Sequence, residues 1–186
     1  YTAHSTDKLN NKYKYGFNEL KPADLSTVKK ESLLNKYVFG YLPDWEYFNE
    51  PWDDHLNIRF DLLSHISIFD FRLTEVGLLT YPFGWYEDWI PLIQEAKSND
   101  VKVILTISNI TSEGIDSNLV SRLLTRESVK NVFFNELKNI IDISNADGIN
   151  LDFEAIKLEE RGSPIVNFVN EVDDSLQSWF GGKELS

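Results

Sequence analysis

Cysteine and methionine are both absent from the 186-residue sequence. Without cysteine, the chain has no disulfide scaffold, no thiolate metal site and no cysteine nucleophile. Its three histidines, His4, His55 and His65, are scattered and lack the spacing of metal ligands. Catalysis must therefore use carboxylates or hydroxyls, and we expect neither a metal nor another cofactor. Because no initiator methionine is present, we expect the chain to begin after processing or to come from a longer protein.

Basic residues are in the minority, with 18 Lys and Arg against 30 Asp and Glu, which gives a formal net charge of -12. This charge argues against nucleic acid or an anionic membrane as the main partner. Long hydrophobic runs are also lacking, and none approaches the roughly 18 residues of a membrane-spanning helix. Since 42% of the residues are hydrophobic and 13% aromatic, we expect a soluble globular protein with a sizeable core.

The texture of the sequence changes near residue 37. Residues 1–36 are polar and rich in Lys, Asn and Ser, and we interpret them as a leader or linker. From Tyr37 onward, short apolar runs of β type alternate with helical patterns, which is typical of repeated βα units and a parallel sheet. The expected strands are Tyr37–Leu42, His65–Phe71, Val101–Ile107 and Gly148–Phe153.

Helices are expected between these strands. Asp88 is predicted to cap a helix that ends near Asn99, and Thr125 is predicted to cap the next one. Ser163-Pro164 opens a last helix, which Gly181-Gly182 closes. Four βα units suit a flavodoxin-like sheet, whereas a closed (βα)8 barrel takes about 250 residues. Periodicity alone does not decide whether the sheet closes.

The expected fourth strand carries the most informative pattern. Side chains on a strand alternate between its two faces, so Asn150, Asp152 and Glu154 share one face. In an edge strand this polar row would simply face water. The preceding strand, Val101–Ile107, is almost wholly apolar and suited to burial on both faces, which makes a freely exposed neighbour improbable. We therefore interpret the row as part of a site.

The same segment resembles a known signature. Asp147–Glu154, read as Asp-Gly-Ile-Asn-Leu-Asp-Phe-Glu, is similar to the Asp-Gly-x-Asp-x-Asp-x-Glu motif of family 18 glycoside hydrolases, the chitinase and endo-β-N-acetylglucosaminidase family. Gly40-Tyr41 followed by Trp45 resembles that family's first strand and following loop, and Ser64–Phe69 its second strand. The resemblance covers about Val38–Ser186. It implies a (βα)8 TIM-barrel fold, of which the chain from residue 37 to residue 186 supplies about the first four βα units.

The resemblance also implies roles for individual residues. Glu154 would be the general acid and base, and Asp152 would hold the acetamido group of the sugar, which acts as nucleophile in place of a second carboxylate. Asn150 and Asp147 would support Asp152, although Asp147 is equally suited to capping a turn with Gly148. The residues that would line the substrate site are Tyr41, Trp45, Phe69 and Thr106, of which Tyr41, Phe69 and Thr106 are equally suited to plain core packing.

Aromatic residues follow the first two strands, where loops would ring the mouth of a barrel. They are Trp45, Tyr47, Phe48 and Trp52 after the first strand, and Phe83, Trp85, Tyr86 and Trp89 after the second. Flat rings at such places suit stacking on sugars, but core packing is the better interpretation for Trp89, which falls inside a helical pattern.

The sequence departs from the family pattern at two places. Asn150 stands where the family usually has Asp, which keeps hydrogen bonding but removes a charge. The third strand usually ends in Ser-x-Gly-Gly, and here Thr106–Asn109 lacks both glycines. Asn109-Ile110-Thr111 also matches a glycosylation sequon, for which chance occurrence is the simpler explanation.

The implied function is hydrolysis of β-1,4 linkages next to N-acetylglucosamine, in chitin or a related polysaccharide or oligosaccharide. The resemblance implies a missing C-terminal half of the barrel as partner, and a secreted, cell-surface or periplasmic location because the substrates are polymeric. A half barrel alone would have two raw sheet edges and an uncovered lumen. The competing interpretation is a non-catalytic, lectin-like glycan-binding relative, and the presence of Glu154 favours the enzyme.

Overall fold

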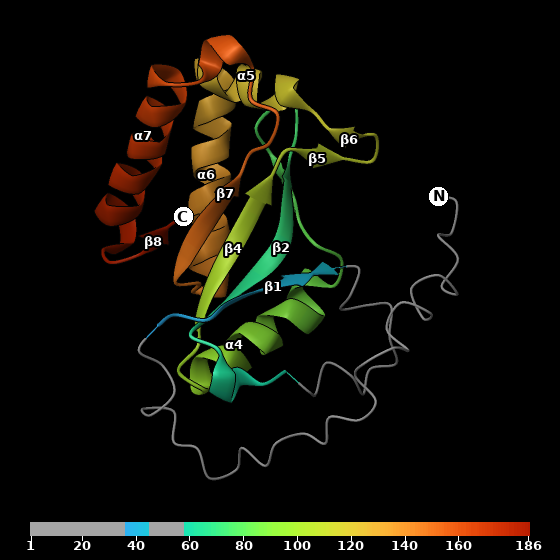
Figure 1. Cartoon of the computed structure of the whole chain (residues 1–186), viewed down its shortest axis with the longest axis vertical. Helices are drawn as coiled ribbons and strands as arrows, with labels where there is room; N and C mark the ends of the chain where they lie inside the picture. The colour runs from blue at the N-terminus through green and yellow to red at the C-terminus, as the bar shows by residue number, and fades with distance from the viewer. Residues whose placement is uncertain (1–35, 45–57) are drawn as a thin grey trace. The chain divides into compact units, whose positions relative to one another are not determined.

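Parallel strands joined by helical crossovers form the centre of the computed structural model, which describes residues 36–44 and 58–186. The main strands are β1 (Phe39–Pro43), β2 (His65–Leu73), β4 (Lys102–Ser108), β7 (Gly148–Asp152) and β8 (Glu184–Leu185). They lie in the order β1-β2-β4-β7-β8, each parallel to the next (Figure 1). A doubly wound sheet reverses its strand order at a switch point. The unreversed order is that of consecutive barrel strands.

The four expected strands are confirmed to within one or two residues at each end. β8 adds a fifth parallel strand, which pairs with the start of β7. The short strand β3 (Leu79–Thr80) pairs antiparallel with the end of β2. A separate hairpin of β5 (Ile110–Thr111) and β6 (Gly114–Ile115) projects from the carboxyl end of β4 (Figure 1).

The helices differ in part from expectation. The last one, α7 (Ser163–Phe180), starts and ends as predicted, with Gly181 and Gly182 at positive φ. The other described helices are α4 (Ile90–Ser98), α5 (Ser117–Thr125) and α6 (Glu127–Ser144), with a π-helical turn, η3 (Trp85–Trp89), leading into α4 and 3-10 turns at η2 (Phe60–Leu62) and η4 (Leu158–Glu160). None of these helices is both long enough and apolar enough to cross a membrane.

Two predicted caps are wrong. Asp88 lies within η3, and α4 continues from Trp89, which is already helical and makes no side-chain cap. Thr125 is the last residue of α5, where its hydroxyl donates to the carbonyl oxygen of Ser121. Helix α5 itself was not predicted. Asp116 caps α5 by accepting the backbone N–H of Asn118 at 2.8 Å.

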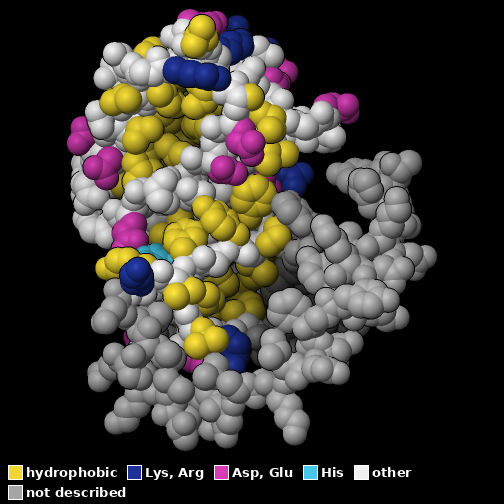
Figure 2. All heavy atoms as spheres, viewed as in Figure 1, with side chains coloured by type: hydrophobic (Ala, Val, Ile, Leu, Met, Phe, Trp, Pro, Cys, Tyr) yellow, Lys and Arg dark blue, Asp and Glu magenta, His cyan; other side chains and the backbone are white. Residues whose placement is uncertain are grey.

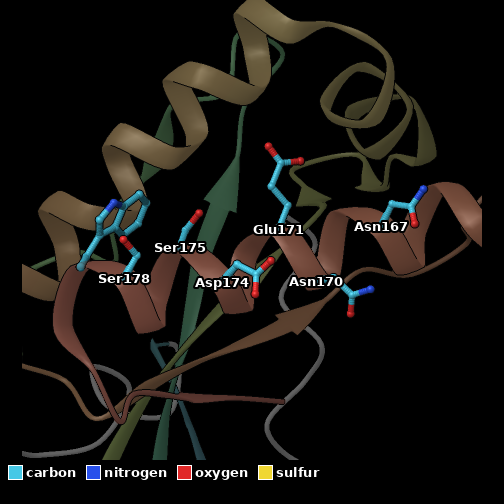
Figure 3. Close-up of a pocket in the computed structure, with 7 residues that line it drawn as sticks. Asn167, Asn170, Glu171, Asp174, Ser175 and Ser178 are labelled. Carbon is cyan, nitrogen blue, oxygen red and sulfur yellow. The ribbon is translucent and has the colours of Figure 1, made fainter.

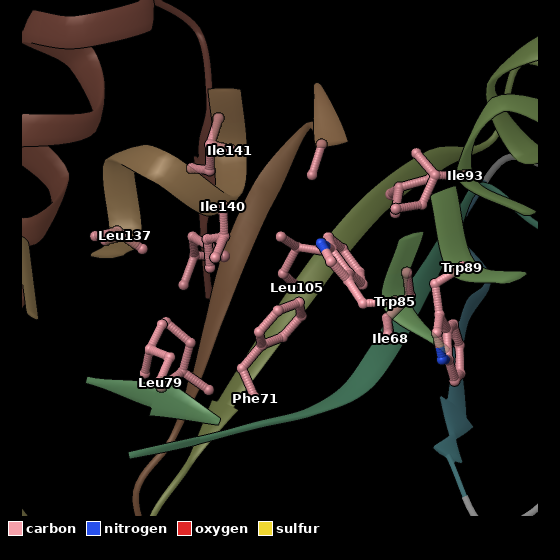
Figure 4. Packing of buried hydrophobic residues seen from close by; sticks show 14 of the residues in the cluster. Ile68, Phe71, Leu79, Trp85, Trp89, Ile93, Leu105, Leu137, Ile140 and Ile141 are labelled. Atoms are coloured by element: carbon pink, nitrogen blue, oxygen red, sulfur yellow. The ribbon is translucent and has the colours of Figure 1, made fainter. Parts of the chain in front are cut away.

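Buried hydrophobic side chains from the strands and helices form one core (Figure 4). The central strand β4 is apolar toward both sides, with Val103, Ile104 and Leu105 at most 1% exposed. Trp89 packs in this core as expected, and its indole N–H donates to the carbonyl oxygen of Phe83 at 2.9 Å. Trp85 is also core, which corrects its predicted place among sugar-stacking rings.

On one face of the sheet the rings at β1 are exposed, whereas Ser67 and Thr106 of the central strands are wholly buried. Tyr37, Phe39 and Tyr41, on and next to β1, are 82%, 38% and 58% exposed. Figure 2 shows a broad band of hydrophobic side chains along the face in view. In the described part of the chain, β1 pairs only with β2, and β8 only with β7, so both edges have a free side. The two free edges are those expected of a partial barrel, and the inner face is open at its β1 edge.

Candidate active site

The polar row of β7 runs from a buried start to an open end. Asn150 is buried, Asp152 is half-buried and Glu154 is exposed just beyond the strand. The alternate residues turn the other way: Ile149 is wholly buried in the core, and the ring of Phe153 lies 6.3 Å from that of Phe168 on α7. The predicted alternation is therefore confirmed within β7, for Asn150 and Asp152. Glu154 follows two residues beyond the strand, at the carboxyl end of the sheet, where barrel enzymes place their chemistry.

Asn150 contacts polar side chains of β1, of β4 and of the residue that follows β8. Its amide nitrogen lies 3.4 Å from the hydroxyls of both Tyr41 and Thr106, and its oxygen accepts from Ser186 at 3.3 Å. Thr106 in turn shares a 2.6 Å hydrogen bond with Ser67. Two predicted site residues, Tyr41 and Thr106, are thus brought to Asn150. Ser67 was not predicted, although it shares the alternation of Phe69 on the same strand.

Asp152 lies in a cavity of about 420 Å³ at the end of the row. The other lining residues are Tyr41, Pro43 and Phe69, and the rings of Tyr41 and Phe69 meet edge to face with centroids 6.5 Å apart. Burial, together with the nearby charges of Glu154 and Asp70, raises the pKa of the Asp152 carboxyl. An apolar wall beside one carboxyl group suits a neutral ring with polar substituents.

Asp70 is a second buried carboxylate, which sequence reasoning missed. It is 2% exposed, and it accepts the hydroxyl of Ser108 at 2.5 Å and the Nε–H of Arg72 at 3.0 Å. Strict alternation would place Asp70 on the face of Ile68. The β2–β4 register shifts between Ile68 and Phe71, which brings Asp70 toward Ser108, the β4 residue paired with Asp152.

Asp147 lies apart from the row, at the amino end of β7. One carboxylate oxygen accepts from the ammonium group of Lys97 at 2.7 Å, and the other from the backbone N–H of Val103 at 2.9 Å. These contacts tie the start of β7 to β4 and to α4. The structure therefore does not bring Asp147 together with Asp152 and Glu154.

The remaining predicted aromatic residues divide into two groups. Trp45, Tyr47, Phe48 and Trp52 lie outside the described residues. Phe83 and Tyr86 are exposed, at 78% and 58%. Asn109 of the sequon has a wholly buried side chain, and both of its amide atoms make hydrogen bonds, so the folded chain does not offer it for glycosylation.

A second cavity, of about 370 Å³, lies along α7 (Figure 3). It is lined by residues of this one helix, Asn167, Asn170, Glu171, Asp174, Ser175, Ser178 and Trp179. Glu171 is paired with Lys130 at 3.0 Å. Across residues 36–44 and 58–186, no group of three His, Asp or Glu side chains is arranged to hold a metal ion. The cavity at Asp152 is the better candidate because several strands converge on it.

Comparison with known proteins finds similarity to this chain in sequence and in fold. YdhD of Bacillus subtilis (strain 168), assigned as a sporulation-specific glycosylase, is 23% identical over 154 residues, which is 82% of this chain and 35% of YdhD. The spore cortex-lytic enzyme SleL of Bacillus cereus superposes with a TM-score of 0.67 at 18% identity, covering 80% of this chain and 34% of SleL. A chitinase of Bacteroides thetaiotaomicron superposes with a TM-score of 0.64 at 15% identity, covering 81% of this chain and 45% of the chitinase chain.

No family model matches the chain. The chain spans about a third of the length of YdhD and SleL. The likeness to solved structures concerns the fold, and it agrees with the barrel order of the strands. By fold, the chain matches part of the TIM barrels of SleL and of chitinases.

Proposed function

We propose that this chain carries the catalytic row of a glycoside hydrolase that cleaves β-1,4 linkages next to N-acetylglucosamine. The observation that carries the proposal is the placement of Asp152 in the cavity lined by Tyr41 and Phe69, with Glu154 exposed two residues beyond the end of β7. Chitinases and cortex-lytic enzymes of the same fold support it.

The arrangement favours a substrate-assisted mechanism with retention. Two carboxylates that flank a scissile bond stand about 5–5.5 Å or 6.5–9.5 Å apart on opposite sides of the sugar. Asp152 and Glu154 instead come from one short segment, at the end of β7 and just beyond it. Asp70, the other carboxylate nearby, is held by Ser108 and Arg72. The nucleophile is therefore assigned to the acetamido oxygen of the substrate.

In this mechanism Glu154 gives its proton to the leaving glycosidic oxygen while the acetamido carbonyl oxygen attacks the anomeric carbon. Asp152 accepts a hydrogen bond from the acetamido N–H and stabilises the positive charge of the cyclic intermediate. Glu154, now a carboxylate, takes a proton from a water molecule. The water oxygen attacks the anomeric carbon and displaces the acetamido oxygen, which opens the cyclic intermediate and restores the acetamido group. Asn150, two residues earlier on β7, is proposed to position Asp152.

The walls of the cavity provide the binding contacts. Tyr41 and Phe69 present ring surfaces to the sugar, and Thr106 supports Asn150 from β4. Trp45 is proposed as a further substrate contact from the loop after β1, and Asp147 as a support that fixes the start of β7. Since the substrates are polymeric glycans, we propose that the protein acts outside the cell or at its surface.

The proposal is tested by incubating the full-length protein with N-acetylglucosamine oligomers and with the matching oligomers of glucosamine, which lack the acetyl group. We expect cleavage of the acetylated oligomers alone, because only they carry the nucleophile. Equal cleavage of both sets would exclude substrate assistance. Binding of the acetylated oligomers without cleavage would instead indicate a lectin-like protein.

A further inference from the structure

The side chain just beyond β4 pairs with the backbone of Glu154. Asn109 is wholly buried. Its Oδ1 accepts the backbone N–H of Glu154 at 2.8 Å, and its Nδ2 donates to the carbonyl oxygen of the same residue at 3.0 Å. One side-chain amide therefore satisfies both backbone groups of the proposed acid.

These contacts begin where the β-ladder ends. The paired register of β4 and β7 runs from Ile104 opposite Gly148 to Ser108 opposite Asp152. Beyond Asp152, strand pairing no longer supports the backbone, and Ala155 has a positive φ of 51°. An amide side chain carries the same donor and acceptor as a peptide group. Asn109 thus extends the pairing by one further step, to Glu154.

Asn109 is itself held from the other side. The Nδ2 of Asn109 also donates to the backbone carbonyl oxygen of Asp116 at 3.0 Å. The backbone carbonyl oxygen of Asn109 accepts the backbone N–H of Asp116 at 3.0 Å. Asp116 closes the hairpin of β5 and β6 and caps α5. The support for Glu154 is therefore anchored to regular structure rather than to a loose loop.

We propose that Asn109 is a positioning residue that fixes the backbone of Glu154 and so aims its carboxyl group at the sugar; as a role in catalysis, this rests on the proposed function. Glu154 has an exposed side chain beyond the last paired residue, so its direction depends on its backbone. A shift of about 1 Å in a catalytic group costs about 10²-fold in rate. Asn109 carries no proton to the reaction and acts only through Glu154.

The test compares Asn109→Ala with Ser144→Ala in the full-length protein, using N-acetylglucosamine oligomers. Ser144 is also buried and makes side-chain hydrogen bonds to backbone, but near the opposite end of β7. For Asn109→Ala we expect kcat to fall about 10- to 100-fold while KM stays within about twofold. For Ser144→Ala we expect both constants within about twofold. Unchanged kcat in Asn109→Ala, or an equal loss in Ser144→Ala, would overturn the proposal.

A second measurement needs neither a variant nor activity. Hydrogen exchange of the full-length protein, followed with single-residue resolution, reports on the Glu154 amide. We expect that amide to be protected like the amide of Leu151 within β7, because Asn109 accepts its proton. Exchange at the rate of an unprotected loop would overturn the positioning role. An inactive protein with a protected Glu154 amide would refute the proposed function while keeping the structural role of Asn109.

Discussion

At Asp152 the surroundings work against the charged form. Burial disfavours the carboxylate, and the neighbouring charges of Glu154 and Asp70 add to this, so the pKa is raised. The folded chain then keeps a proton on Asp152 at pH values where the unfolded chain has lost it. Asp152 therefore destabilises the fold increasingly as the pH rises from the ordinary carboxyl pKa through the raised one.

This sign leads to a pH-dependent prediction. Asp152→Asn is expected to raise the free energy of unfolding of the full-length protein at pH 7, because the amide carries no charge to bury. The difference in the free energy of unfolding between variant and parent should shrink toward zero near pH 3, where the protonated Asp152 carboxyl group is uncharged like the amide that replaces it. Denaturant unfolding at several pH values measures it, with the exposed Asp142→Asn as control. A parent protein more stable than Asp152→Asn at pH 7 would contradict the prediction.

Single residues were predictable where one strand decides their place. Alternation along β7 was enough to put Asn150 and Asp152 on one face, because a strand has a period of two. The roles of Asp70 and Asn109 were not predictable in this way. Asp70 depends on an irregular register between β2 and β4, and Asn109 on a contact with a residue 45 positions away.

Among the elements, β7 and β8 approach so closely that only glycine fits at their junction. A Cβ built on Gly148 would lie 2.3 Å from the carbonyl oxygen of Glu184, which belongs to the backbone and cannot swing away. Glu184 is held at this place by pairing with β7 and by its side-chain contacts with Lys102 and His65. The close packing of β8 against β7 thus explains why the motif has glycine at position 148.

We therefore expect Gly148→Ala to destabilise the protein by about 1–3 kcal/mol, the usual cost of overpacking. The matched control is Gly40→Ala in β1, where the added Cβ would meet only a Leu63 methyl group at 3.4 Å. Thermal or denaturant unfolding of both variants gives the comparison. If Gly148→Ala is as stable as Gly40→Ala, the close approach of β8 is wrong.

Element positions followed from apolar runs, but two helix starts did not. Each run of β-type residues became a strand because its side chains enter the core on at least one side. Asp88 and Thr125 are common capping residues, yet a cap also needs a non-helical backbone at that point. Both residues are inside helical turns, so the chemistry of the side chain alone misled the prediction.

At the scale of the whole molecule, the unreversed strand order and the open face agree with a partial barrel. Sequence periodicity could not distinguish this arrangement from a doubly wound sheet, because both consist of βα units. The distinction lies in which strands are neighbours, and that depends on contacts between distant segments. The sequence motif at Asp147–Glu154 indicated the barrel, whereas the periodicity did not.

The most direct test of the account is the turnover of Glu154→Gln in the full-length protein with an N-acetylglucosamine oligomer, measured beside binding of the same oligomer. Glutamine keeps the size of the side chain but cannot donate a proton as an acid, so we expect turnover to fall about 10²- to 10⁴-fold with affinity nearly unchanged. Glu159→Gln, an exposed change in the 3-10 turn η4, is expected to retain the parent rate. A Glu154→Gln protein that hydrolyses the oligomer as fast as the parent would contradict the account.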